Sequence, residues 1–109
     1  MEQKSIEEMK SIILCLIPKE PKGYHESDLA KDSGIRGREC RRIIQILREE
    51  GHPICSSTRD GYWLARSSSE LLVVEHDLRS HIRSCIRTYS AIKKTRNKMK
   101  EEENRYCQY

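Results

Sequence analysis

The chain has 109 residues, the size of one ordinary domain, which permits a modest core but no large enclosed active site. Charged residues make up 35% of it and the net charge is +4. No apolar run approaches the roughly 18 residues that cross a membrane, and the opening MEQKSIEEMK is too acidic for a signal peptide. We therefore expect a cytoplasmic protein with no membrane partner.

The positive charge is concentrated in two segments. Residues 36–48 hold five arginines and one glutamate, and residues 83–100 hold seven basic residues and no acidic one. These segments carry +4 and +7, so the remainder of a chain with net charge +4 must carry −7. Such segregation is typical of proteins that bind a phosphate backbone, although an acidic protein or a membrane surface would fit the charge alone.

The five cysteines are scattered and form no C-x-x-C motif: Cys15, Cys40, Cys55, Cys85 and Cys107. This pattern argues against a disulfide framework and against a zinc site, and it indicates a reducing setting. Cys40, Cys55 and Cys85 fall where small buried residues are expected. Because His76 and His81 lack the spacing that would place two ligands on one helix face, we expect no metal and no other cofactor.

An apolar residue at every third or fourth position predicts an amphipathic first helix through Ile6, Met9, Ile13 and Leu16. Ser5 is its expected cap. A short second helix is predicted from Glu26 to Ser33, with Leu29 and Ala30 turned inward. Gly34 is expected to end that helix in the left-handed conformation.

A third helix is predicted from Gly37 to Glu50 and is closed by Gly51. Its apolar residues fall on one side of a helical wheel: Cys40, Ile43, Ile44 and Leu47. Its long polar side chains fall on the opposite side: Arg38, Arg41, Arg42 and Gln45. Arginine and glutamine are the donors suited to guanine and adenine edges in a major groove.

A β-hairpin is predicted next, with strands at 53–56 and 62–65 joined by an Asp-Gly turn. Ile54 and one of Tyr62 or Leu64 are expected to face the core. Arg59, at the tip, is expected to reach a flanking phosphate or a minor groove.

A long last helix is predicted to begin at residues 67–70. Its apolar stripe spans about three heptads, through Leu71, Val74, Leu78, Ile82, Cys85, Tyr89 and Ile92. We expect this stripe to form a dimer seam between two copies of the chain, with docking on the first helix as the alternative. The last residues, 101–109, are expected to fray.

The pattern L-A-x-x-S-G-I-x-G-R-E-x-R-R-I-I-x-x-L-R-E-E-G-x-P-I-x-S, followed by Gly61-Tyr62, resembles the biotin-repressor type of winged helix-turn-helix domain. It is also similar to small winged-helix proteins encoded by bacteriophages and prophages. The resemblance covers residues 12–65 and implies a recognition helix that enters DNA. Arg36 departs from the family, which often has a capping Ser or Thr there, so the third helix must start on Ser33 or on backbone contacts.

The predicted fold class is mainly α with a small β-hairpin wing, a winged helix-turn-helix followed by a long C-terminal helix. The predicted domains are residues 1–66, the winged module, and residues 67–109, a helical extension for dimerisation or a basic tail. The sequence contains no recognisable Ser-His-Asp grouping, paired-carboxylate motif or Gly-rich phosphate loop. We therefore expect that the protein is not an enzyme.

The function expected from these features is sequence-specific binding of double-stranded DNA by a phage or prophage transcriptional regulator, a homodimer on the bacterial nucleoid. The expected DNA-contacting residues are Arg36, Arg38, Arg41, Arg42, Gln45, Arg59, Lys93, Lys94, Arg96 and Lys98. One alternative is an accessory protein for replication initiation or helicase loading. Another is a winged helix that inhibits a host protein. The DNA hypothesis requires guanidinium groups that are neither covered by the protein nor neutralised by carboxylates.

Overall fold

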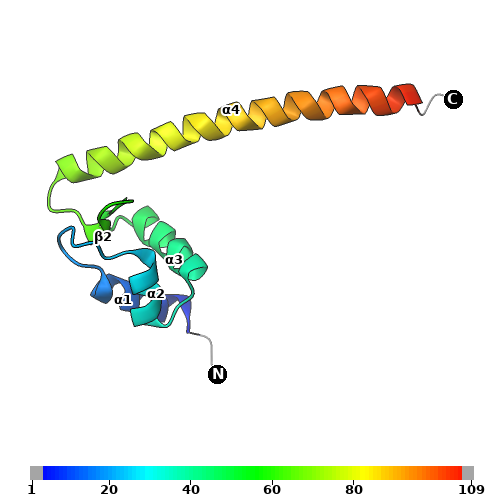
Figure 1. Ribbon diagram of the computed structural model, residues 1–109. Helices are drawn as coiled ribbons and strands as arrows, with labels where there is room; N and C mark the ends of the chain where they lie inside the picture. Colours follow the sequence, from blue (N-terminus) through cyan, green and yellow to red (C-terminus); the bar gives the residue numbers. More distant parts are fainter. Residues whose placement is uncertain (1–3, 107–109) are drawn as a thin grey trace. The chain divides into compact units, whose positions relative to one another are not determined.

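The computed structural model describes residues 4–106 and contains four helices and one hairpin within them (Figure 1). The elements are α1 (Ile6–Leu16), α2 (Glu26–Ser33), α3 (Gly37–Glu49), β1 (Ile54–Ser57), β2 (Gly61–Leu64) and α4 (Ser68–Tyr106). The predicted fold class is confirmed: the protein is mainly helical, with a small antiparallel hairpin and a long C-terminal helix.

The chain divides into two compact units, one ending at Val74 and one beginning at Glu75. The division lies inside α4, so the first turns of this helix belong to the same unit as the hairpin. The predicted boundary, between residues 66 and 67, lies earlier in the chain, just before Ser68, where α4 begins.

The ends of the first two helices follow from local chemistry. Ser5 caps α1 as predicted, because its Oγ accepts a hydrogen bond from the Glu8 backbone N–H at 3.2 Å. At the start of α2, the His25 backbone N–H donates to Asp28 Oδ2 at 3.0 Å. Gly34 ends α2 with φ 72°, the left-handed conformation expected there.

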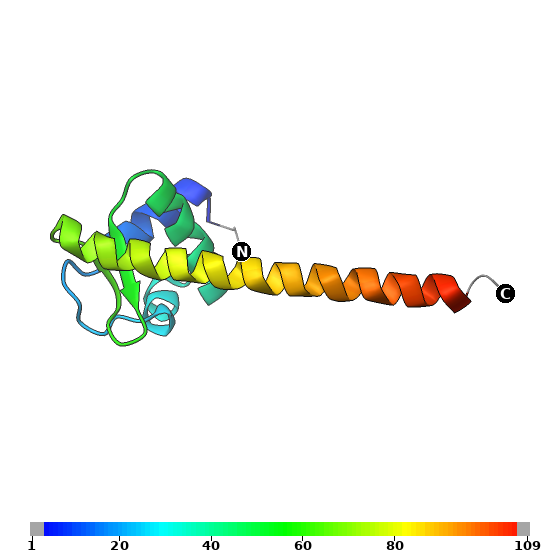
Figure 2. The same cartoon turned by 90° about the horizontal axis from the view of Figure 1, so that it is seen from above.

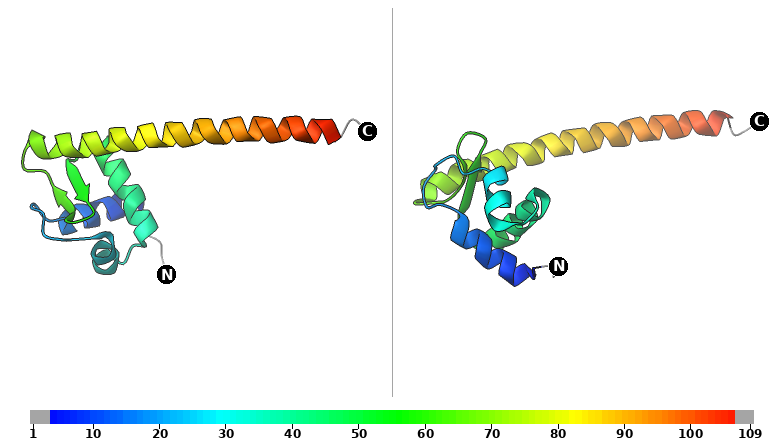
Figure 3. Two further views of the ribbon diagram at one scale, coloured as in Figure 1. Left: turned by 45° about the horizontal axis from the view of Figure 1, so that its top comes forward. Right: turned by 60° about the horizontal axis from the view of Figure 1, so that its bottom comes forward.

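The three short helices pack against one another around a single apolar core (Figure 3). The core residues are Ile13, Ile17, Leu29, Ile35, Cys40, Ile43, Ile44, Leu47 and Ile54. The whole predicted stripe of α3 is among them, which confirms the orientation of that helix. Since one side of α3 is buried in the core, its opposite side is left for solvent or a partner.

The hairpin is buried on both of its faces. Ile54 pairs with Leu64 and Ser56 with Tyr62, and both Tyr62 and Leu64 pack against the core, whereas only one of them was expected to. On the other face, Cys55 pairs with Trp63, and both side chains are buried. The hairpin is also tied to the segment before α2, because the Tyr62 N–H donates to Tyr24 O at 2.8 Å.

The helix α4 is one continuous helix of 39 residues (Figure 2). At its start the Glu70 carboxylate accepts hydrogen bonds from the side chain and backbone N–H of Arg66, which lower the pKa of Glu70. The expected fraying is wrong for residues 101–106, which are helical, because Glu and Arg are good helix formers. Residues 107–109, where fraying was also expected, lie outside the described part.

Between residues 4 and 106, no helix combines the length and the apolar character that crossing a bilayer requires.

Candidate nucleic-acid interface

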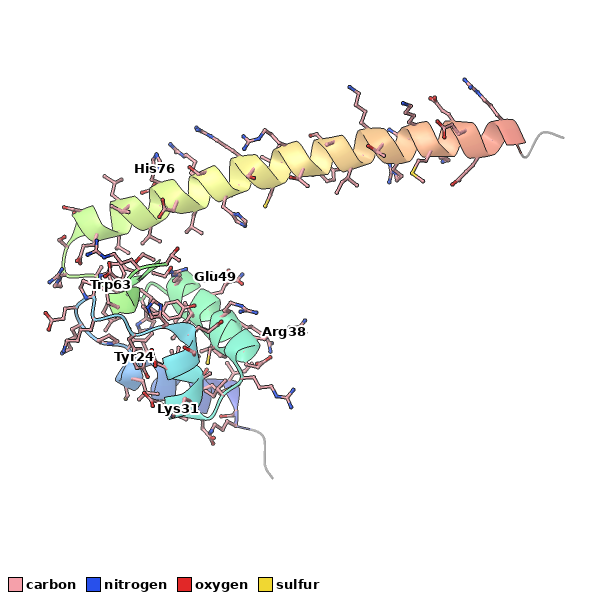
Figure 4. The ribbon with its side chains drawn as sticks, in the orientation of Figure 1. Tyr24, Lys31, Arg38, Glu49, Trp63 and His76 are labelled. Atoms are coloured by element: carbon pink, nitrogen blue, oxygen red, sulfur yellow. The ribbon has the colours of Figure 1, made fainter. Side chains whose placement is uncertain are left out.

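The side chains predicted to contact DNA from α3 gather around one open surface groove. It is lined by Arg36, Arg38, Glu39, Arg41, Arg42 and Gln45. All of these except Glu39 are exposed. Figure 4 shows Arg38 pointing away from the helices of its unit. The groove therefore presents four guanidinium groups and one amide on the side of α3 opposite the core.

The start of α3 lies at this groove and has no side-chain cap. Arg36 is the N-cap residue and makes no capping hydrogen bond with its side chain. Ser33 does not replace it, because its Oγ accepts from the Ile35 N–H at 3.0 Å and from no described backbone N–H of α3. The helix begins instead on the backbone bond from Cys40 N–H to Arg36 O at 2.9 Å. An uncapped helix start exposes N–H groups and the positive end of the helix dipole.

Two of the four guanidinium groups are each paired with a carboxylate of their own, so the requirement that none be neutralised is met only in part. Arg41 Nη1 lies 2.9 Å from Glu26 Oε1, and Arg42 Nη1 lies 3.5 Å from Glu39 Oε2. Arg36 and Arg38 make no side-chain hydrogen bond or ion pair with other residues in the described range. The positive field of the groove is therefore weaker than the arginine count alone implies.

These ion pairs are open to solvent, which limits their strength. The side chains of Arg41 and Arg42 are 61% and 59% exposed. Exposed pairs of this kind contribute about 0–1 kcal/mol. A phosphate can replace the Glu39 carboxylate beside Arg42 at small cost, because that pair is a single contact of 3.5 Å.

Arg48, the fifth arginine of the segment, is half-buried and does not line the groove. Its Nε donates to Ile54 O at 2.9 Å and its Nη2 donates to Ser56 Oγ at 3.0 Å. Burial lowers the pKa of the Arg48 guanidinium. This side chain ties the end of α3 to β1, and its charge does not add to the groove.

Arg59 is exposed in the turn between the two strands, as predicted. The turn is ordered by Ser57, whose Oγ accepts from the Asp60 N–H at 2.9 Å. The Arg59 side chain makes no hydrogen bond within residues 4–106, so it is free to meet a phosphate.

The basic residues predicted to contact DNA from α4 are exposed, and helical geometry separates them into two pairs. At about 100° per residue, Lys94 and Lys98 lie on the side opposite the apolar stripe, where Arg83 and Arg87 also lie. Lys93 and Arg96 lie along the stripe instead. A single surface therefore cannot engage all four predicted residues.

The predicted seam residues from Leu78 to Ile92 are exposed, and Val74 is half-buried. The expectation of a buried Cys85 is wrong, because nothing within its own unit covers α4 at that position. His81 Nε2 lies 3.6 Å from Cys85 Sγ, one turn along the helix, a pairing not foreseen from the histidine spacing alone. In the described part of the chain, no group of three or more His, Cys, Asp or Glu side chains is placed to hold a metal ion.

Glu26 is the site residue that sequence reasoning missed. It is the first residue of α2, and it lies 15 positions before Arg41 in the sequence. No motif or periodicity connects the two residues. Only the packing of α2 on α3 brings this carboxylate to the groove.

No protein-family model, curated protein or solved structure matches the chain.

Proposed function

We propose that this protein binds double-stranded DNA sequence-specifically, in the manner of winged helix-turn-helix domains of the biotin-repressor type. In this proposal the N-terminal half of α3 enters the major groove and the hairpin lies on the flanking backbone. The observation that carries it is the open groove on α3, where four arginines and one glutamine face solvent together. These side chains donate to guanine and adenine edges, and an uncapped helix start attracts phosphate.

Within this proposal the residues have different tasks. Arg38, Arg41, Arg42 and Gln45 contact bases or adjacent phosphates, while Arg36 and Arg59 position the module on the backbone. The basic residues of α4 add affinity without specificity. Two copies pair through the apolar stripe of α4. Such a protein would act in the cytoplasm, on the nucleoid, as a transcriptional regulator of a phage or prophage.

Selection of bound sequences from a random duplex pool, followed by a salt titration on the recovered duplex, tests the DNA proposal. If about five phosphates are neutralised, log K should fall against log salt with a slope of about −4 to −5. A palindromic motif with half-sites about one helical turn apart would support both the dimer and the DNA role. A slope near zero would rule this binding mode out.

Arg38→Ala is the most direct variant for the same assay, because Arg38 is exposed and has no side-chain partner among residues 4–106. Its removal should leave the fold intact. If Arg38 contacts a phosphate, the slope should become shallower by about 1. If it contacts a base, one position of the selected motif should lose its preference.

A second candidate function is capture of a protein, for instance inhibition of a host factor. The ion pairs with Glu26 and Glu39 favour it, because they engage two of the guanidinium groups that binding to a phosphate backbone would use. Under this alternative the wild-type protein retains no DNA. The double variant Arg38→Ala with Arg41→Ala would then leave partner capture intact.

A further inference from the structure

Arg41 is the only arginine of the groove that is bound by a carboxylate from another helix within the described residues. Its Nη1 donates to both oxygens of Glu26, at 2.9 Å to Oε1 and 3.0 Å to Oε2. Both contacts use the same nitrogen. The other two nitrogens, Nε and Nη2, make no hydrogen bond within residues 4–106.

This choice of nitrogen matters because a guanidinium has two forked edges. The edge formed by Nε and Nη2 carries two parallel N–H groups that point in one direction. That edge can donate to two acceptors at once, and guanine presents such a pair, O6 and N7, in the major groove. Glu26 therefore binds only Nη1 of Arg41 and leaves the edge formed by Nε and Nη2 available for two acceptors.

Glu26 is itself held in place, which makes it an effective support. Its carboxyl Cδ lies where a Cβ added at Gly37 would approach to 3.3 Å, so the side chain rests on the first residue of α3. The carboxylate is also next to the positive end of that helix, where an anion is stabilised. Its side chain is 33% exposed, against 61% for Arg41.

The neighbouring pair, Arg42 with Glu39, is different. It is a single contact of 3.5 Å between residues on the same helix, three positions apart. Among the residues that the structure describes, no side chain from another element donates a hydrogen bond to the Glu39 carboxylate. Arg42 is thus free to change rotamer and follow a phosphate, whereas Arg41 is held in one direction.

We propose that Glu26 is a positioning residue, which holds Arg41 so that its free edge reads one guanine. This inference rests on the DNA-binding function proposed above. It assigns specificity to Arg41, and backbone affinity to Arg38 and Arg42. A carboxylate near DNA lowers affinity for any duplex, and the preorganised fork raises discrimination between duplexes.

The test compares wild type with Glu26→Gln, using a duplex recovered by selection and copies of it changed at one base pair at a time. Glutamine removes the charge and one acceptor oxygen, so Arg41 loses its two-oxygen support. We expect tighter binding to an unrelated duplex. We expect the preference for guanine at one position of the selected duplex to fall by about fivefold or more, the lower range of a bidentate contact.

Glu39→Gln is the matched control, because it removes the same charge beside Arg42. It should raise affinity for the unrelated duplex to a similar extent and leave every base preference unchanged. Arg41→Lys keeps the positive charge but cannot form the fork. It should therefore lose the same guanine preference as Glu26→Gln with an unaltered salt slope, and it provides the measurement if Glu26→Gln does not fold.

Equal shifts for specific and unrelated duplexes in Glu26→Gln, with base preferences intact, would overturn the positioning role and leave Glu26 as a charge alone. A guanine preference that survives Arg41→Lys would also overturn it. A wild-type protein that binds no duplex would refute the proposed function and this inference together. That outcome is distinct, because it appears before any variant is compared.

Discussion

Arg38 and Arg48 are the same residue type on the same helix, and the structure gives them opposite surroundings. Arg38 is exposed and lines the groove, while Arg48 is half-buried and donates to Ile54 O and Ser56 Oγ. A charged donor that is partly buried stabilises the fold only while its acceptors stay in place. Arg48 is therefore a structural residue, although it lies within the basic segment.

The variant Arg48→Ala should lower the free energy of unfolding by about 2 kcal/mol, because it removes two hydrogen bonds and the packing of the stem. Arg38→Ala, the control, should change it by less than about 0.5 kcal/mol. Urea denaturation followed by circular dichroism measures both. Equal stability of the two variants would show that the contacts of Arg48 with β1 contribute nothing.

Sequence reasoning at this scale succeeded where a residue lies clearly on one side of a helix. Cys40 and Leu47 were predicted to be buried and are, and Arg41 was predicted to be exposed and is. It gave no prediction for Arg48, which lies at the edge of the wheel, where the contacts with β1 decide which way the side chain turns. It also failed for Glu26, because a contact across 15 positions leaves no periodic signal.

At the scale of elements, the hairpin depends on one crowded glycine. Gly61 has φ 70°, and a Cβ added there would lie 2.2 Å from Tyr24 O. Tyr24 accepts the Tyr62 N–H, so the strand and the segment before α2 are in direct backbone contact at this point. No side chain fits between them.

Gly61→Ala should therefore destabilise the protein by more than about 3 kcal/mol, because the backbone must separate and the bond to Tyr24 is lost. Gly23→Ala is the control. Gly23 has a similar φ of 77°, but an added Cβ meets nothing within 4 Å. It should cost only the about 1–2 kcal/mol of the left-handed conformation. Similar urea midpoints for the two variants would contradict the crowding argument.

Local sequence signals predicted where the elements begin and end more accurately than they predicted which faces are buried. Gly34 and Gly51 marked the ends of α2 and α3 within one or two residues, and the Asp60-Gly61 pair marked the start of β2. Burial of Cys55 was expected and is confirmed, but burial of Trp63 beside it on the second face of the hairpin was not foreseen. A strand of four residues carries no information about what covers its other side, which is decided by distant segments.

At the scale of the whole molecule, α4 combines two properties that oppose each other. Its apolar stripe of exposed side chains favours pairing with a second copy: Leu78, Ile82, Tyr89 and Ile92. Pairing would also bring together two basic segments, each with seven positive charges between residues 83 and 100. The like charges on the two copies repel one another unless salt or a polyanion screens them.

Self-association and DNA binding should therefore depend on salt in opposite directions. Rising salt should strengthen pairing of α4 by screening the repulsion, and it should weaken DNA binding by competing with phosphate contacts. Sedimentation equilibrium over a range of salt concentrations measures the first effect. The mass should rise from 12.9 kDa toward twice that value as salt increases. A constant 12.9 kDa at every protein and salt concentration would instead support docking of the stripe within one chain.

Two substitutions to glutamate separate the faces of the helix. Ile82→Glu places a charge in the stripe and should keep the protein monomeric at all salt concentrations. Arg87→Glu lies on the opposite face and reduces the repulsion, so pairing should already occur at lower salt than in wild type. If both variants paired equally well, the stripe would not be the seam. Duplex DNA is a polyanion and can screen the same repulsion as salt. It should therefore promote pairing of the wild type at low ionic strength, and it should not promote pairing of Ile82→Glu.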